Sequence, residues 1–512
     1  MRGVMCKDSR LSFFVLLLVS TLALALGAAN LVFGDLNQDE GWYLYAAQNV
    51  ARGGVPYRDF FFTQGPVMPH VYAAFAPLWS PFGVIGGRAL TLALGLAAAA
   101  LAGLLAARQF PRGRRAAPWT ATFALTACCA YHSYFTVIPK TYALSSLFLV
   151  SACLLLTRPL SRVAVFFAGV LFACATATRI SMGAAALAAG VWLLLQHRRA
   201  PWQWCALATG GVVGLLACFG PFWLVAWDQW LFANQFHASR EGGGLMMVAG
   251  SAARLLRGYF PLAVMGVCAV FLEIRNRAQR VPSECDRNAV LWLAAGGAVL
   301  ALQWMSPFPY DDYQVPAMPL IAAAVATVAF RHVEKSSFQA PVAALLVAVV
   351  AGFHVVASPV LQSWFFIRQD RFWPVMKPAP DVVALTRVAR TIPPGTFLLT
   401  QDAYLAVAGG HHLPRGFEMG PFGYFAELSD AEAARQNVLN AAGLRRVIVD
   451  SGAPYAMFSG YAFAMSAPAM ARLSEEERKA FFDLVAEHYE LLETVADFGQ
   501  NHTPLTIWKR KE

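Results

Sequence analysis

Long apolar runs separated by short polar connections occupy about the first 360 residues of the chain. Each run is close to the roughly 17–25 residues that an α-helix needs to cross about 30 Å of hydrocarbon. The runs lie at about 11–33, 88–107, 118–138, 141–157, 162–178, 180–196, 203–226, 259–274, 288–305, 314–330 and 339–361. The pattern predicts about eleven transmembrane helices, the first of them an uncleaved helix, because its apolar run exceeds that of a signal peptide.

Composition supports a membrane protein. Apolar residues make up 58% of the chain and charged residues 14%, against roughly 45–50% and about 25% in soluble domains. Lipid is the solvent that tolerates this much apolar helix surface. An ordinary soluble enzyme, a disordered protein and a secreted disulfide scaffold are therefore excluded.

The basic residues gather in every second connection between the apolar runs. The clusters are Arg2, Lys7 and Arg10; Arg108, Arg112, Arg114 and Arg115; Arg158 and Arg162; Arg198 and Arg199; Arg275, Arg277, Arg280 and Arg287; and Arg331 and Lys335. The positive-inside rule places these clusters and the N-terminus in the cytoplasm. The intervening segments and the C-terminal region then face outward. Because the net charge of +10 is explained by topology, we expect no nucleic-acid partner.

The stretch 66–86 is apolar and aromatic but is broken by four prolines. If it crossed the membrane, Arg112, Arg114 and Arg115 would face outward, against the positive-inside rule. We therefore expect it to lie as an interfacial helix in the first outer loop.

That loop carries the most informative motif. It reads GDLNQDEGWYLYAAQNVARGGVPYRDFFFTQGP from Gly34. The pattern DEGWYLYAAQ…PYRDFF…QGP, placed after one N-terminal helix, resembles the GT-C superfamily of membrane glycosyltransferases. The nearest branch in this respect holds aminoarabinose transferase and the Rgt-like lipopolysaccharide sugar transferases, which are distantly related to protein O-mannosyltransferases. The resemblance covers roughly the first 90 residues.

The resemblance implies a polytopic GT-C-like fold in the bacterial inner membrane, surrounded by membrane lipids. The donor would be a polyprenyl-phosphate-linked sugar, and the acceptor an envelope glycan, lipid or protein at the outer face. Asp39 is the candidate base, carried over from the acidic position of the motif, and Glu40 is the alternative. Lipid phosphate leaves readily, so one carboxylate that takes the acceptor's proton suffices. Direct displacement inverts the anomeric carbon.

Cations are needed to hold the departing phosphate. Arg58 is favoured because the Pro-Tyr-Arg-Asp turn restrains it, and Lys140 because it lies in a very short connection. Arg52 and Arg179 are further candidates at the outer side. For each of these residues the alternative is ordinary snorkelling towards phospholipid headgroups.

Sugar and acceptor contacts are expected from Asp311, Asp312 and Tyr313, in the outer connection MSPFPYDDYQVPAMP, and from Tyr57. The two acids suit either the hydroxyls of a neutral sugar or the ammonium of an amino sugar, and they disfavour a uronic acid. Two adjacent acids cannot complete a metal coordination shell. No metal site and no resident cofactor is therefore expected, although a divalent ion at these acids stays an alternative.

The composition turns polar from about Asp381, and predicted strands alternate there with amphipathic helices. The segments TFLLT, RRVIVD and LTIWKR predict strands, and 429–442 and 474–489 predict helices. This alternation is typical of an α/β domain. We expect a transmembrane domain over 1–362 and an outward-facing α/β domain over 363–512 that covers the membrane site.

Two other classes of function compete with this prediction. One is a transporter or flippase for lipid-linked glycans, and the other is a non-catalytic GT-C-fold assembly partner. A transporter commonly shows internal repeats and ionisable residues at mid-membrane depth. The sequence shows no detectable repeat and few such residues, so a glycosyltransferase is favoured.

Overall fold

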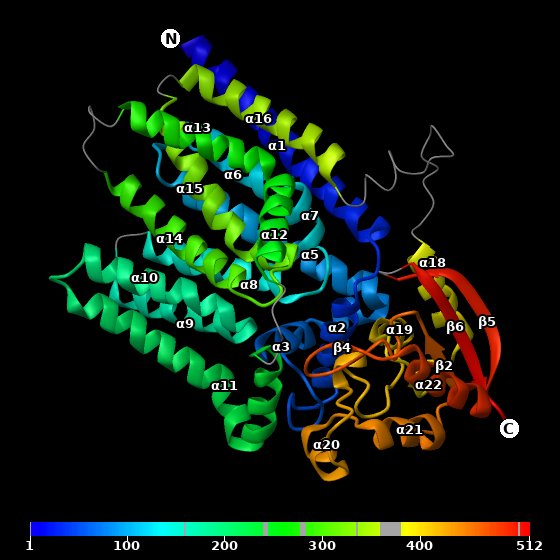
Figure 1. Cartoon of the computed structure of the whole chain (residues 1–512). Helices are drawn as coiled ribbons and strands as arrows, with labels where there is room; N and C mark the ends of the chain where they lie inside the picture. The colour runs from blue at the N-terminus through cyan, green and yellow to red at the C-terminus, as the bar shows by residue number, and fades with distance from the viewer. Residues whose placement is uncertain are drawn as a thin grey trace, which may run out of the picture.

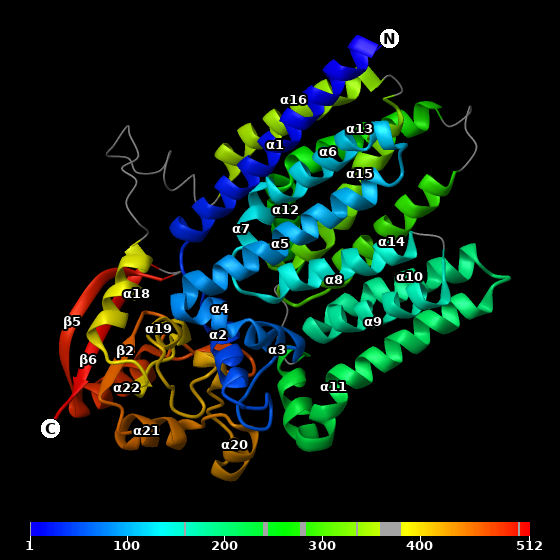
Figure 2. The same cartoon turned by 180° about the vertical axis from the view of Figure 1, so that it is seen from behind.

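The computed structural model describes residues 2–157, 160–238, 244–276, 283–333, 336–358, 380–499 and 502–512. It shows a bundle of long helices with a mixed α/β domain at one end (Figure 1). The N-terminus of α1 lies at the opposite end of the bundle from this domain (Figure 2). Arg158, Arg277, Arg280, Lys335 and the predicted domain boundary at 362/363 lie outside the described residues.

Every predicted apolar run coincides with one helix or with two consecutive helices. The helices are α1 (Arg2–Phe33), α5 (Gly83–Ala107), α6 (Ala116–Ala127), α7 (Ala130–Phe135), α8 (Thr141–Leu156), α9 (Arg162–Thr178), α10 (Gly183–Gln196), α11 (Pro201–Ala238), α13 (Phe260–Asn276), α14 (Glu284–Trp304), α15 (Met318–Arg331) and α16 (Ser336–Ala357). A further helix, α12 (Gly244–Gly258), lies in a predicted outer connection. The predicted polytopic helical architecture is confirmed.

The number of helices long enough to span a membrane is smaller than the eleven predicted. Within the described residues, six helices have the required length and hydropathy, or seven if α12 and α13, bent by 86°, form one broken span. Three shorter apolar helices follow one another in the segments 141–156, 162–178 and 180–196. The run 118–138 is interrupted at Cys128 and Cys129, between α6 and α7, which the apolar pattern alone does not reveal.

The segment 66–86 forms short pieces rather than one membrane span. It contains α3 (Val67–Ala74), α4 (Ala76–Trp79) and the 3₁₀ turn η1 (Ser80–Phe82), after which α5 begins. Proline lacks the backbone N–H that a continuing helix needs, which explains the breaks. Leu78 and Phe82 are exposed apolar side chains, as expected for a segment lying against lipid.

The C-terminal domain contains a four-stranded sheet in the order β1-β2-β6-β5. Its strands are β1 (Leu398–Leu399), β2 (Tyr455–Phe458), β5 (Tyr489–Phe498) and β6 (Thr503–Arg510). The pair β1 and β2 is parallel, and the other pairs are antiparallel. The remaining elements are α18 (Pro380–Thr391), α19 (Ala403–Gly409), α20 (Asp430–Gln436), α21 (Ala441–Asp450), α22 (Glu475–His488) and the hairpin β3 (Met465–Ser466) with β4 (Ala471–Arg472).

The α/β character of this domain is confirmed, but one predicted strand is wrong. RRVIVD belongs to helix α21, whose buried side chains Leu444 and Ile448 are four residues apart on one face.

 Asn440 caps this helix by accepting a hydrogen bond from the backbone N–H of Gly443 at 2.7 Å. The cap favours a helix where the consecutive β-branched residues of RRVIVD suggest a strand.

Strands β2 and β5 were not predicted from the sequence. β5 is a strand at the edge of the sheet with few buried side chains. Its sequence therefore lacks the regular alternation of apolar and polar residues by which a half-buried strand is recognised.

The domain rests on the first loop of the membrane region. Helix α2 (Gln38–Ala51) packs against α19, and a Cβ atom on Gly41 would stand 2.4 Å from the backbone nitrogen of Tyr404. The hydroxyl of Tyr45 accepts a hydrogen bond from the backbone N–H of Leu413 at 2.7 Å. Gln38 donates from Nε2 to Asp402 at 2.9 Å. These contacts hold the start of α2 between the bundle and the domain.

We expect Gly41→Ala to lower the thermal unfolding midpoint, because the added methyl group must displace the backbone of α19. Overpacking of this kind costs about 1–3 kcal/mol. Gly297→Ala is the matched control, since nothing lies within 4 Å of its Cβ position. Unfolding of the detergent-solubilised protein can be followed by tryptophan fluorescence. Equal midpoints for the two variants would contradict the close packing of α2 on α19.

Candidate functional site

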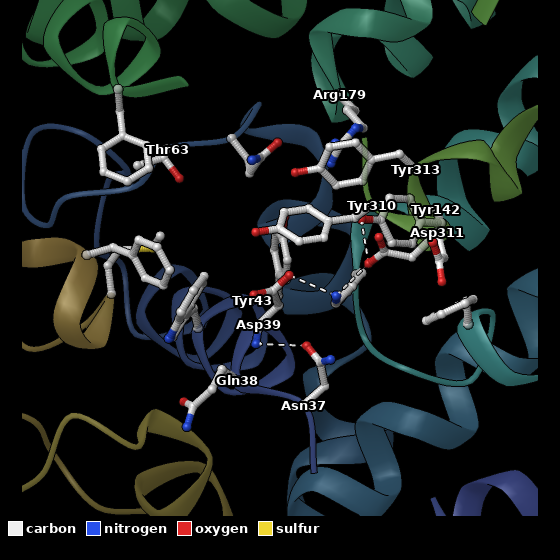
Figure 3. A pocket seen from close by; sticks show the side chains of 18 of the residues that line it. Asn37, Gln38, Asp39, Tyr43, Thr63, Tyr142, Arg179, Tyr310, Asp311 and Tyr313 are labelled. Atoms are coloured by element: carbon white, nitrogen blue, oxygen red, sulfur yellow. Dashed lines mark hydrogen bonds and ion pairs between the residues drawn. The ribbon is translucent and has the colours of Figure 1, made fainter. Parts of the chain in front are cut away.

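A cavity of about 450 Å³ lies where the first turn of α2 meets the ends of several membrane helices and the C-terminal domain (Figure 3). Its walls are rich in aromatic side chains. The charged residues that line it are Asp39, Lys140, Arg179, Arg254, Asp311 and Asp312. These residues come from distant parts of the sequence, and the fold brings them to one end of the bundle.

Each charged residue sits at the end of an element or in a connection. Asp39 lies in the first turn of α2, and its backbone N–H donates to the side chain of the N-cap residue Asn37 at 3.1 Å. Lys140 immediately precedes α8, and Arg179 immediately follows α9. Asp311 and Asp312 begin the 3₁₀ helix η5 (Asp311–Ala317), and Arg254 lies on α12. Helix ends thus supply most of the site.

Lys140 links two carboxylates. Its Nζ atom lies 2.9 Å from Asp39 Oδ2 and 2.7 Å from Asp312 Oδ2. The hydroxyl of Tyr142 also donates to Asp312, at 3.0 Å. The side chain of Asp39 is 34% exposed, whereas that of Lys140 is 6% exposed. Asp39 is therefore held on one side by Lys140 and remains open to the cavity.

Two neighbouring carboxylates keep Lys140 in its protonated, charged form. Burial on its own lowers the pKa of this lysine, but the carboxylates of Asp312 and Asp39 outweigh burial and raise the pKa well above its ordinary value. The lysine thus stays protonated, and two of its N–H groups are directed at carboxylates.

Arg254 forms the second charged contact of the cavity. Its Nε atom lies 2.7 Å from Asp311 Oδ1 and 3.0 Å from Oδ2. The arginine side chain is 47% exposed, so the pair lies towards the mouth of the cavity and is accessible to water.

Arg179 differs from the other two cations. Among the described residues, no carboxylate forms an ion pair with it, and its buried Nε atom has no hydrogen-bond partner. Its guanidinium lies over the ring of Tyr313 at 4.2 Å and over the ring of Tyr142 at 5.3 Å. The aromatic rings stabilise the cation without neutralising it. Arg179 is therefore available to bind an anion.

Glu40, the alternative candidate base, lines no part of this cavity. It is completely buried and forms two hydrogen bonds with Arg88, at 2.8 and 2.7 Å. It also accepts from the backbone N–H of Asn37 at 2.7 Å. Arg88 donates further hydrogen bonds to the carbonyl oxygens of Leu31, Gly34 and Asp35. Glu40 thus shapes the loop that presents Asp39, and we do not retain it as a base.

Three other candidates also lie outside the cavity. Arg58 is 49% exposed and pairs with its neighbour Asp59 at 2.8 Å, while Arg52 contacts His412 Nδ1 at 3.3 Å. Tyr57 is buried, and its hydroxyl donates to the carbonyl oxygen of Gln64 at 2.6 Å. The left-handed backbone of Tyr57, with φ 71°, reverses the chain before Arg58. These placements argue against phosphate binding by Arg52 and Arg58 and against a sugar contact by Tyr57.

Several lining residues were not among the sequence candidates. Arg254, Tyr43, Tyr142 and Tyr310 come from the membrane region, and Tyr461 comes from the C-terminal domain. Arg254 could have been chosen as a candidate from the sequence, because arginine is uncommon in outer segments under the positive-inside rule. The tyrosines have no comparable signal, since Tyr is frequent at every membrane interface.

No group of three or more His, Cys, Asp or Glu side chains in the described part of the chain is arranged to hold a metal ion. The carboxylates of the cavity are instead directed at lysine and arginine nitrogens.

Comparison with solved structures identifies the fold. The crystal structure of ArnT from Cupriavidus metallidurans bound to undecaprenyl phosphate matches with a TM-score of 0.62 and 14% identity, covering 96% of this chain and 97% of that one. The apo oligosaccharyltransferase of Archaeoglobus fulgidus matches with a TM-score of 0.52 and 12% identity, covering 98% of this chain and 74% of that one. No protein-family profile and no curated protein matches the sequence. The chain has the GT-C fold, as its first loop predicts.

Replacing Arg88 with Met should destabilise the protein strongly, because it leaves the carboxylate of Glu40 buried without a cation. Breaking a buried pair in this way costs about 3–5 kcal/mol. Arg58→Met is the matched control, since the pair of Arg58 with Asp59 is exposed to solvent, where an ion pair contributes little to stability. Thermal unfolding of both variants measures the difference. Similar losses in the two variants would show that the pair of Glu40 and Arg88 does not anchor the loop.

Proposed function

We propose that this protein of GT-C fold is a membrane glycosyltransferase that uses a polyprenyl-phosphate-linked sugar. One observation carries the proposal: a single cavity unites the accessible carboxylate of Asp39 with Arg179, a cation that has no carboxylate partner among the described residues. The ArnT structure, which shares the fold, was solved with undecaprenyl phosphate. The acceptor would be a lipid, polysaccharide or protein of the cell envelope.

In this proposal Arg179 binds the lipid phosphate. As the bond between the sugar and the phosphate breaks, negative charge grows on the phosphate oxygens. A guanidinium directed at these oxygens stabilises that charge through charge-assisted hydrogen bonds. Tyr142 and Tyr313 hold the guanidinium from its faces, which leaves its N–H groups free to donate at its edge.

Asp39 acts as the base. Its carboxylate takes the proton from the acceptor's hydroxyl or amine while the acceptor attacks the anomeric carbon. A retaining mechanism needs a further carboxylate as nucleophile. Asp312 and Asp311 are directed at Lys140 and Arg254, so neither is free for that role. Direct displacement with inversion is the course that this arrangement favours.

Lys140 orients the base in this mechanism. Because its N–H groups are directed at Asp39 and Asp312, phosphate binding is assigned to Arg179. Lys140 keeps the carboxylate of Asp39 in one position, and Asp312 in turn keeps Lys140 in place. Holding the carboxylate in the orientation that the reaction needs lowers the entropic part of the activation barrier.

We propose that the cavity faces the outer side of a bacterial inner membrane. The C-terminal domain lies at one end of the bundle, and the N-terminus of α1 lies at the other (Figure 2). Residues of the C-terminal domain line the cavity, which therefore lies at the same end as that domain. The arginine clusters of the sequence favour a cytoplasmic location for the N-terminal end.

Asp39→Asn should lower turnover by about 10²–10⁴-fold, because an amide cannot accept the acceptor's proton. Asp59→Asn is the matched control, since Asp59 lies outside the cavity. A strain that lacks the gene would first be profiled by mass spectrometry of surface lipids, polysaccharides and glycoproteins to find the missing sugar. Each variant is then tested for restoring that mass. Full restoration by folded Asp39→Asn would refute the assignment of the base.

Arg179→Gln should weaken binding of undecaprenyl phosphate by about ten- to a hundredfold, since hydrogen bonds to charged groups contribute about 1.5–3 kcal/mol. Arg52→Gln serves as the control, because that arginine lies outside the cavity. Binding to protein in lipid nanodiscs can be measured by native mass spectrometry. An unchanged affinity in Arg179→Gln would remove this residue from the phosphate site.

Reporter fusions after Ala117 and after Glu512 should report opposite sides of the membrane. The first position lies in a predicted cytoplasmic cluster of arginines, and the second lies in the domain at the cavity end of the bundle. Periplasmic phosphatase activity is expected only for the fusion after Glu512. The same result from both fusions would overturn the proposed orientation.

A further inference from the structure

The distribution of charge in the cavity bears on the kind of sugar that it accepts. Three carboxylates line the cavity, and each has a cation within 3.0 Å. Asp39 and Asp312 share Lys140, and Asp311 is paired with Arg254. Among the described residues that line the cavity, every carboxylate is therefore already engaged.

An amino sugar would place an ammonium group in this cavity. A charge moved out of water needs an opposite charge or several hydrogen bonds to replace its hydration. Asp312 and Asp311 can supply this only by giving up Lys140 or Arg254, which would leave one of these cations without its partner. Asp39 has an open side, but the proposed reaction needs that side for the acceptor's proton. The cavity thus offers no carboxylate that is reserved for an ammonium group.

A uronic acid would place a carboxylate there instead. Lys140 and Arg254 are engaged by aspartates, and Arg179 is the cation assigned to the lipid phosphate. A second anion on the sugar would compete with the phosphate for Arg179. Repulsion from Asp39 and Asp311 would add to this cost.

The groups left for the sugar are neutral. Tyr43, Tyr313 and Tyr461 line the cavity, and no hydrogen bond of their hydroxyls is found among the described residues. A tyrosine hydroxyl both donates and accepts, which suits sugar hydroxyls. Trp42 and Phe62 add apolar surface to the same walls, against which the C–H face of a sugar ring can pack.

We propose that the sugar carried by the donor is uncharged, either a neutral hexose or pentose or an N-acetylated sugar, and that the three pairs of aspartate with Lys140 and Arg254 exclude amino sugars and uronic acids. This inference rests on the proposed glycosyltransferase function. It selects between the neutral and the amino sugar, both of which the two adjacent acids of the sequence allow.

The test compares matched donors on the full-length protein in nanodiscs. The probes are undecaprenyl phosphate carrying glucose, glucosamine or glucuronic acid, and the corresponding set in the manno series. Bare undecaprenyl phosphate measures the contribution of the lipid. In at least one series the neutral donor should bind at least tenfold more tightly than both charged donors. A charged donor that binds as tightly as its neutral counterpart in both series would overturn the inference. Failure of the bare carrier and all donors to bind would overturn the proposed function itself.

A second measurement tests the cause of the selectivity. Arg254→Gln frees the carboxylate of Asp311, so the preference for glucose over glucosamine should fall at least fivefold. Arg257→Gln is the control, because Arg257 lies on the same helix but does not line the cavity. The unfolding midpoint of each variant checks that it is folded. An unchanged preference in folded Arg254→Gln would overturn the role of the ion pairs.

Discussion

The buried ion pair between Glu40 and Arg88 is the constraint on which the site depends. Both side chains are almost completely removed from solvent, where an unpaired charge is strongly unfavourable. The pair joins the first turn of α2 to α5, and Arg88 also binds the carbonyl oxygens at the end of α1. Successive residues of a helix point about 100° apart. With Glu40 fixed towards Arg88, its neighbour Asp39 is directed into the cavity.

The charges around Asp39 divide into two kinds. Lys140 and Arg254 are paired with aspartates and shape the cavity, whereas Arg179 is stabilised by aromatic rings and keeps its charge available. This division gives the proposed mechanism one base and one anion-binding group. Among the described residues it also leaves the hydroxyls of Tyr43, Tyr313 and Tyr461 without a hydrogen-bond partner in the cavity, which is why we propose a neutral sugar.

The C-terminal domain is part of the site. Helix α19 packs on α2 with almost no space at Gly41, and Tyr461, Met419 and Phe422 contribute to the cavity wall. A domain held so closely to the loop of Asp39 limits which acceptors can approach the carboxylate. The same contacts make the stability of the loop and that of the domain interdependent.

The sequence by itself determined the helical membrane architecture, the α/β domain, the GT-C likeness and the importance of the first loop. Apolar runs and a local motif carry that information, because they act within one segment. Tertiary structure placed Asp39 at the cavity and Glu40 against Arg88, which adjacent acids in a sequence cannot reveal. It also separated Arg179 from Arg58 and brought Arg254 to Asp311. Ion pairs between residues far apart in the chain leave no periodic pattern, so only the folded chain shows which charges meet.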